Sequence, residues 1–137
     1  MSDLARVGVA IDADLLEKFD EQIERRGYAN RSEAVRDLIR DSLIRENVST
    51  PDAEVVGTLT LVYDHHVRQL ADRLNEFQHD HHKEIISTLH VHLDHHNCLE
   101  VIVLRGQCSN VQRIADGLIS LKGISHGQLA LSAAGRV

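Results

Sequence analysis

Alternating apolar and polar positions at the start of the chain predict a short strand followed by two helices. In the stretch RVGVAI, residues 6–11, valine or isoleucine occupies every second position, which is the period of a half-buried strand. Apolar side chains then recur every three or four residues over 12–27 and again over 29–47, the spacing of amphipathic helices. The first part of the chain is therefore predicted to fold as strand, helix, helix.

This N-terminal unit, predicted over residues 1–48, is too small to bury its own apolar faces. Gly27 is placed to end the first helix, and Asn30 to cap the second, with Glu33 three residues on as in a capping box. A lone strand has no partner for its backbone hydrogen-bonding groups. We therefore expect the strand to pair with its copy in a second chain.

The spacing of apolar residues changes after a predicted linker over 48–54, which holds the only proline. The second domain, 54–137, alternates the periods of strands and helices in the order βαββαβ, which is typical of a ferredoxin-like sheet with both helices on one face. The predicted elements are a strand at 54–64, a helix at 65–78, strands at 85–94 and 98–106, a helix at 109–123 and a strand at 124–132. The predicted fold class is thus α+β.

Composition narrows the possible functions. The chain has 137 residues, 42% of them hydrophobic, which suits a globular protein with a packed core. It contains no apolar run long enough to cross a bilayer, and its start lacks the order of a signal peptide, so we expect a cytoplasmic protein. Aromatic residues are only 3%, which argues against a platform that stacks single-stranded bases. The net charge of −6 gives no general support for DNA binding, so a DNA site would need a local arrangement.

Two cysteines are too few for a disulfide framework and are expected to be thiols. No other candidate ligands stand near Cys108 in the sequence, and it is interpreted as a small residue at a helix start. No nucleophile stands beside a recognisable base and orienting group, so the sequence does not predict an enzyme.

The segment TLHVHLDHHNC, residues 88–98, carries the candidate chemistry. His90 and His92 share one face of a strand, because side chains alternate between faces. The apolar residues of both neighbouring strands share one face only if the numbers of paired residues have an even sum, and pairing His92 with Cys98 across a three-residue loop meets that condition. A two-residue loop would send the thiol to the apolar side. The hydrophobic pattern therefore predicts that His90, His92 and Cys98 converge.

Three ligands leave one coordination position open. The residues expected to supply a fourth ligand, from the same chain or a symmetry mate, are His79, His81 and His82. A thiolate with imidazoles suits a late transition metal; a planar arrangement would select Ni(II) or Cu(II), a tetrahedral one Zn(II), and spacing leaves both open. Among the other histidines, His95 is the best candidate for a secondary site. The simpler interpretation is a solvated, histidine-rich hairpin.

Taken together, the segments RRGYANRSEAVRDLIR, QHDHH, TLHVHLDHHNCLEVIVLRG and ISHGQLAL resemble the NikR-type nickel-responsive repressors of the ribbon-helix-helix (CopG) class. The resemblance covers nearly the whole chain, and its second half reproduces the family's metal motif. It implies a homotetramer, a dimer of dimers, in which ferredoxin-like (ACT-type) domains form the centre and ribbon-helix-helix dimers flank it.

The resemblance also implies a ligand set. His90, His92 and Cys98 would bind one square-planar nickel per subunit, with His79 of the partner subunit as the fourth ligand. Glu100 matches a position that does not bind the metal but could fix the orientation of an imidazole ligand or of the neighbouring backbone. Glu33 and Asp37 match a weaker cation site.

For DNA, the resemblance implies that paired strands enter the major groove of a palindromic operator in double-stranded DNA. The residues that would face the bases are Arg6, Gly8 and Ala10. Arg6 can read guanine, whereas Gly8 and Ala10 lack the hydrogen-bonding side chains usual there, which changes the expected operator sequence and affinity.

The start of the second helix offers free N–H groups to a phosphate through Asn30, Arg31 and Ser32. The alternative interpretation of these three residues is an ordinary helix cap.

The leading hypothesis is therefore a nickel-dependent DNA-binding repressor. A second is a metal-binding or storage protein whose DNA binding has weakened, which the glycine and alanine at the base-reading positions motivate. A third is an ACT domain that senses an amino acid and needs no thiolate ligand.

Overall fold

The computed structural model describes residues 3–48 and 50–135. Contacts divide the chain into two compact units, Met1–Asp41 and Ser42–Val137, with the division inside the second helix. The predicted linker over 48–54 includes Ser49, which lies outside the described residues. The proposed domain limits of 1–48 and 54–137 remain a prediction.

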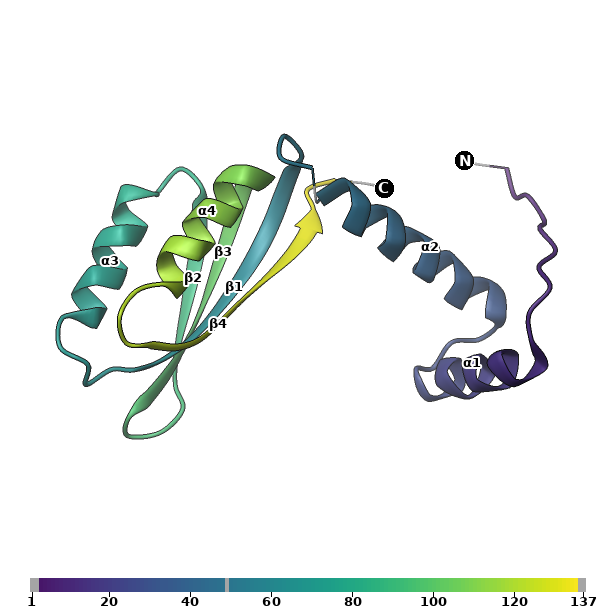
Figure 1. The fold of residues 1–137 in the computed structure, drawn as a ribbon, viewed down its shortest axis with the longest axis horizontal. Coiled ribbons are helices and arrows are strands. Elements are labelled where there is room, and N and C mark those ends of the chain that lie inside the picture. Colours follow the sequence, from purple (N-terminus) through teal and green to yellow (C-terminus); the bar gives the residue numbers. More distant parts are fainter. Residues whose placement is uncertain (1–2, 49, 136–137) are drawn as a thin grey trace. The chain divides into compact units, whose positions relative to one another are not determined.

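The first unit contains two helical segments, α1 (Ala13–Arg25) and the first part of α2 (Arg31–Val48) (Figure 1). Gly27 ends α1 with φ +80°, a left-handed conformation that glycine adopts without steric cost, and Asn30 Oδ1 accepts a 2.9 Å hydrogen bond from the N–H of Glu33 at the start of α2. Both end signals are therefore confirmed. Within the described residues, no helix is long and apolar enough to cross a bilayer.

The predicted strand at 6–11, which we expect to pair with its copy in a second chain, is not formed in the single chain. The described residues 3–12 form no strand and are exposed, with Val7 82% and Val9 72% accessible. The physical reason is that a strand needs a neighbouring strand for its backbone hydrogen bonds, and this segment has none within one chain.

The second unit is built on a four-stranded antiparallel sheet with strand order β2-β3-β1-β4 (Figure 1). This is the ferredoxin-like βαββαβ arrangement, as predicted. Its elements are β1 (Glu54–Asp64), α3 (Leu70–Asp80), β2 (Ile85–His92), β3 (Asn97–Gln107), α4 (Cys108–Ile119) and β4 (Ile124–Ala133).

One face of the sheet packs against both helices and forms the core. The buried core residues of the two helices and the two central strands are Val55, Leu59, Leu61, Tyr63, Leu70, Leu74, Cys98, Ile102, Leu104, Cys108, Val111, Ile114, Ala115 and Leu118. The other face stays open, because Leu89 is 60% and Leu93 52% exposed. The core is thus one-sided, and an apolar face is left without a cover in the single chain.

Cys108 begins α4, as the sequence indicated. Its side chain is buried, and its thiol donates a 2.8 Å hydrogen bond to the carbonyl oxygen of Val48. This contact joins the end of α2 to the start of α4 within the second unit.

The helix predicted at 65–78 begins five residues later, at Leu70. Asp64 accepts a 2.9 Å hydrogen bond from the N–H of His66, which turns the chain after β1, and Gln69 before the helix has φ +67°. The short polar side chain competes with helix formation here. His65 and His66 consequently lie in a turn at the end of β1.

Leu74 anchors α3 to the sheet and is 1% exposed. We expect Leu74→Ala to lower the free energy of unfolding by about 2–5 kcal/mol, because it removes buried methyl groups and leaves a cavity. Asn75→Ala, at the exposed neighbouring position, should change it by no more than about 0.5 kcal/mol. Urea denaturation followed by circular dichroism measures both, and equal effects of the two variants would contradict the packing described.

Candidate metal centre

The hairpin of β2 and β3 has the register that the hydrophobic pattern predicts. His92 lies opposite Cys98 and Val91 opposite Leu99. The N–H of Leu93 donates a 2.9 Å hydrogen bond to the carbonyl of Asn97, which leaves residues 94–96 as the loop. The thiol and the imidazole are therefore cross-strand neighbours on one face.

That face is the one covered by the helices. Cys98 is fully buried, and Glu100 is only 6% exposed. His90 and His92, on the edge strand of the sheet, stay accessible. The candidate site thus joins a buried thiol to imidazoles that solvent can reach.

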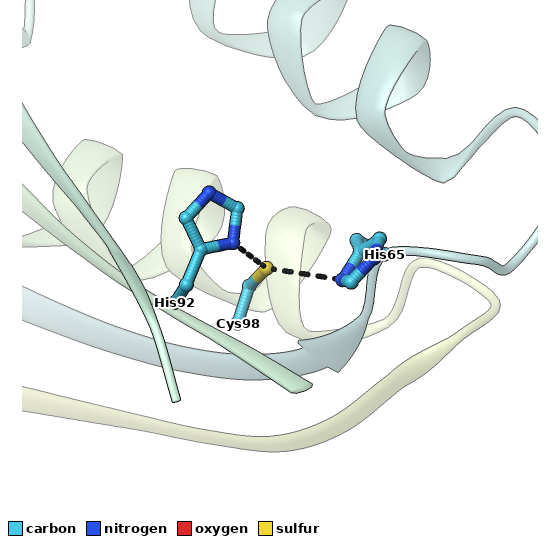
Figure 2. A group of neighbouring side chains, drawn as sticks. All are labelled: His65, His92 and Cys98. Carbon is cyan, nitrogen blue, oxygen red and sulfur yellow. Dashed lines mark hydrogen bonds between the residues drawn. The ribbon is translucent and has the colours of Figure 1, made fainter. Parts of the chain in front are cut away.

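Figure 2 shows that the Cys98 thiol lies between two imidazoles from different parts of the chain. Its Sγ atom is 3.4 Å from Nδ1 of His92 and 3.5 Å from Nδ1 of His65. One candidate ligand atom from each of the three residues lies within 4.8 Å of those of the other two. These donors can converge on a single cation.

Sequence reasoning missed His65, which stands at the start of the predicted helix at 65–78 and is not among the ligands expected from the sequence. The signal that could have found it is the strand order, because β1 lies next to β3 and Tyr63 pairs with Cys98. The chain turns two residues later, and this turn brings His65 to the thiol. Predicting that contact requires the sheet topology and the true start of α3 together.

His90 lies beside this group. Its ring centroid is 5.0 Å from that of His92, and its Nδ1 atom is 3.3 Å from the Tyr63 hydroxyl and 3.5 Å from Oε1 of Glu100. The structure thus brings three of the predicted ligands to one end of the sheet, with His90 held by a tyrosine and a carboxylate.

Glu100 connects His90 to the end of α3. The Gln78 amide donates a 3.0 Å hydrogen bond to Oε2 of Glu100 and accepts one of 3.0 Å from the Thr88 hydroxyl. The carboxylate therefore faces the candidate ligand with one oxygen and α3 with the other. This placement supports the predicted role of Glu100 in fixing the orientation of a ligand.

Burial determines the charge state of the thiol. Desolvation raises the pKa of Cys98, and the carboxylates of Asp64, Asp94 and Glu100 raise it further. Burial together with Glu100 also raises the pKa of Tyr63 to about 12. Without a cation the thiol therefore stays protonated, and the negative surroundings favour a positive ion.

Of the three histidines considered for a fourth ligand, His81 has its ring engaged within the chain. It stacks on Phe77 at 4.4 Å between centroids, and its Nδ1 atom is 2.8 Å from the Phe77 carbonyl. His79, in the last turn of α3, and His82, past its end, are exposed with ring centroids 6.4 Å apart, and Nδ1 of His82 is 3.2 Å from the carbonyl oxygen of His79. In this single chain, neither belongs to the group around Cys98.

In the predicted weaker cation site, one of the two carboxylates already accepts hydrogen bonds within the chain. Both oxygens of Asp37 already accept hydrogen bonds, one of 2.7 Å from the Tyr28 hydroxyl and one of 3.0 Å from Arg40. Glu33 is exposed, with its backbone N–H bound by the helix cap. A cation at this position would share Asp37 with these donors, because each carboxylate oxygen keeps a second lone pair.

The predicted base-reading residues are accessible. Arg6, Gly8 and Ala10 lie in the exposed segment 3–12, and a Cβ atom added at Gly8 would meet no other atom within 4 Å. Their contact with DNA remains a prediction.

The predicted phosphate site at the start of α2 is partly engaged within the chain. Asn30 caps the helix, and the Arg31 guanidinium donates hydrogen bonds of 2.8 and 2.7 Å to the two oxygens of Asp20. Ser32 is exposed. The geometry of Asn30 agrees with the simpler interpretation, a helix cap.

Asp94 organises the hairpin loop that contains His95. Its Oδ1 atom accepts hydrogen bonds of 2.8 Å from the N–H groups of His96 and Asn97, and these bonds lower its pKa to about 2. His95 itself is exposed in the turn. Its predicted role in a secondary site remains a prediction.

Comparison with known proteins adds independent findings. Residues 56–132 match the model of the NikR C-terminal nickel binding domain, and residues 5–46 match that of ribbon-helix-helix proteins of the copG family. A nickel-responsive regulator from Solibacter usitatus is 60% identical over 98% of this chain and 97% of its own length. Similar regulators from Trichlorobacter lovleyi and Geobacter sulfurreducens are 55% and 57% identical, each over 98% of this chain and at least 96% of its own length.

The side chains present fit nickel. A thiol and several imidazoles within one small region are ligands that late transition metals prefer to Mg²⁺ or Ca²⁺. Burial raises the pKa of Cys98, and a bound cation would favour its thiolate form.

The lowered pKa of Asp94 predicts a pH-dependent contribution to stability. The unfolded carboxyl has a pKa of about 3.9, so the stabilisation is fully present above about pH 4 and is lost as the pH falls through the folded value of about 2. In metal-free protein, the stability difference between wild type and Asp94→Ala should therefore be constant above about pH 4 and shrink toward pH 2. Urea denaturation at several pH values measures it; a difference that grows toward low pH would contradict the assignment.

Proposed function

The chain belongs to the NikR family of nickel-responsive ribbon-helix-helix regulators, and we propose that it acts in the cytoplasm as a repressor whose affinity for a palindromic operator depends on nickel. The family consists of DNA-binding regulators and not of enzymes. The observation that carries the proposal is the buried Cys98 thiol with an imidazole nitrogen 3.4 Å away across the hairpin. A soft sulfur donor held in this way, which binds the metal as a thiolate, suits a nickel sensor.

The proposed site in each subunit consists of His90, His92 and Cys98, completed by His79 of the partner subunit. The hairpin register, the hydrogen bond between Tyr63 and His90 and the nearby Glu100 carboxylate support the first three. The exposure of His79 at the end of α3 supports the fourth, because an exposed imidazole is available to another chain. Bound nickel would supply metal–ligand bonds between two subunits, one ion per subunit.

The open face of the sheet supports a tetramer. Leu89 and Val91 on the edge strand β2, and Leu93 directly after it, expose apolar side chains to water. A second copy packed on this face would bury the apolar side chains, which stabilises the assembly by roughly 25 cal/mol for each Å² removed from water. We propose that these faces meet in the centre of a homotetramer.

The N-terminal units supply the DNA-binding surface in this proposal. Two copies of the segment 3–12 would pair as a ribbon, which satisfies their backbone groups and places Arg6, Gly8 and Ala10 toward the bases. The net charge of −6 limits nonspecific attraction to phosphate. The difference in affinity between the two states must therefore come from nickel favouring the DNA-competent arrangement.

The proposal is tested by comparing wild type with Cys98→Ala and His79→Ala in the presence of nickel. We expect Cys98→Ala to lose the thiolate-to-nickel absorption band, and both variants to lose the nickel-dependent shift of the protein's own promoter DNA in a gel. His79→Ala should keep a thiolate band with changed intensity, because the thiol remains while the ligand from the neighbouring subunit is gone.

Three results would contradict parts of this proposal. A wild-type protein that binds nickel but shifts no promoter DNA would favour the alternative, a metal-binding or storage protein with weakened DNA binding, for which Gly8 and Ala10 are the motivating residues. Full nickel binding by Cys98→Ala would exclude the thiolate site. An unchanged gel shift with His79→Ala would exclude bridging between subunits.

A charge on the open face tests the tetramer. Leu89→Asp should dissociate the protein into smaller species in sedimentation velocity, because an unpaired carboxylate cannot be buried without a large cost. Asn75→Asp adds the same charge on the exposed side of α3 and should leave the assembly unchanged. Circular dichroism verifies that both variants fold, and a folded Leu89→Asp that stays tetrameric would disprove this interface.

A further inference from the structure

The last turn of α3 is held against its neighbour α4 by the ring of Phe77. Leu70, Leu74 and Phe77 follow one another at helical spacing on the face of α3 that packs on the core. The two helices lie side by side on the same face of the sheet (Figure 1). Leu70 and Leu74 are the buried residues of α3, whereas α4 buries five. Beyond Leu74, the apolar contact of α3 is therefore made by Phe77.

The ring of Phe77 lies directly on the backbone of α4 at Gly117. A Cβ atom added at Gly117 would be 2.6 Å from Cζ and 3.0 Å from Cε2 of the ring. Carbon atoms in contact are usually about 3.5–4.0 Å apart, so the ring occupies the space that a side chain at this position would need. Glycine inside a helix is less favourable than alanine, and here its missing side chain makes room for the ring.

A second aromatic contact joins Phe77 to the turn that follows α3. The His81 ring stacks on it with centroids 4.4 Å apart, and Nδ1 of His81 is 2.8 Å from the carbonyl oxygen of Phe77. The carbonyl oxygen of His81 accepts hydrogen bonds of 3.2 and 3.1 Å from the N–H groups of Glu84 and Ile85, where β2 begins. One ring thus contacts both α4 and the connection from α3 to β2.

These contacts lie on either side of His79, the proposed ligand for the partner subunit. His79 is exposed, and it stands two residues after Phe77 and two before His81. The last carbonyl groups of a helix lack helical partners, so helix ends fray easily. An imidazole on a frayed turn is correctly placed for a metal in only a fraction of the molecules, which lowers the apparent affinity by that fraction.

We propose that Phe77, through its contact with Gly117, is a positioning residue for the nickel site: it keeps the last turn of α3 helical before the metal binds, and so sets where His79 meets the ion. The proposal rests on the proposed function, because it takes His79 as the ligand given to the partner subunit. Phe77 offers no ligand atom and acts only through the helix.

The first measurement needs no metal. In metal-free, full-length protein, hydrogen–deuterium exchange should show that Phe77→Ala lowers the protection of the amide groups of residues 77–81 by about tenfold, while α4 keeps its protection. Gly117→Ala should have the same effect on α3 although alanine favours the helical form of α4, because the added Cβ atom displaces the ring. Combining the two substitutions should have no larger effect than either alone, since both remove one contact.

The second measurement is the nickel affinity, determined by competition with a chelator. Phe77→Ala and Gly117→Ala should each weaken binding by about tenfold, the factor expected when roughly a tenth of the molecules keep the binding-competent arrangement. In a His79→Ala background neither should weaken it further, because the ligand that they position is gone. Val111→Ala is the matched control. It truncates a fully buried side chain of α4, so it should lower stability and leave the nickel affinity of the folded protein unchanged.

The outcomes separate this proposal from the proposed function. Unchanged exchange at residues 77–81 in Phe77→Ala, or unchanged nickel affinity in Phe77→Ala when His79→Ala weakens binding, would overturn the positioning role alone. A loss of affinity that persists when Phe77→Ala is combined with His79→Ala, or that Val111→Ala reproduces, would assign the effect to general stability and also overturn it. Wild-type affinity in His79→Ala would contradict the proposed ligand set itself, and the positioning role with it.

Discussion

The pairing of His92 with Cys98 across one hairpin is the constraint on which the rest of the site depends. In a strand, a slip by one residue sends every side chain to the other face. The observed register places Cys98 beneath the helices and opposite Tyr63 on the next strand. From that single alignment follow the burial of the thiol, the approach of His65 after the turn, and the position of Glu100 behind His90.

At this hairpin the covered face of the sheet carries polar side chains and the exposed face carries apolar ones. Imidazoles, a thiol and a carboxylate lie on the face that the helices cover, while Leu89 and Val91 remain in solvent in the single chain. Ionising a buried thiol next to carboxylates is unfavourable, and so is the exposure of leucine and valine side chains to water. Both conditions are unfavourable in an isolated subunit, and a cation on one face and a second copy on the other would relieve them.

Local patterns predicted the hairpin well because its register depends on residues that are neighbours in sequence. The same holds for Asn30, which caps the helix three residues from its partner, and for Gly27. Two elements differ in the single chain from the pattern for other reasons. The segment at 6–11 lacks a partner strand within the chain, and the predicted helix at 65–78 starts late because the Asp64 side chain binds the turn that follows it. Periodicity records neither a missing partner nor such a competing hydrogen bond.

Long-range contacts explain what the sequence did not reveal about the site. His65 reaches Cys98 across 33 positions, and Gln78 reaches Glu100 across 22. These contacts exist only after three strands and one helix have taken their places. The arrangement therefore makes ligand geometry a property of the folded unit, and any ion that binds these side chains must stabilise that unit over the unfolded chain. Gln78, which donates a hydrogen bond to Glu100, directly precedes His79 in α3, so a bound ion would also stabilise the end of this helix.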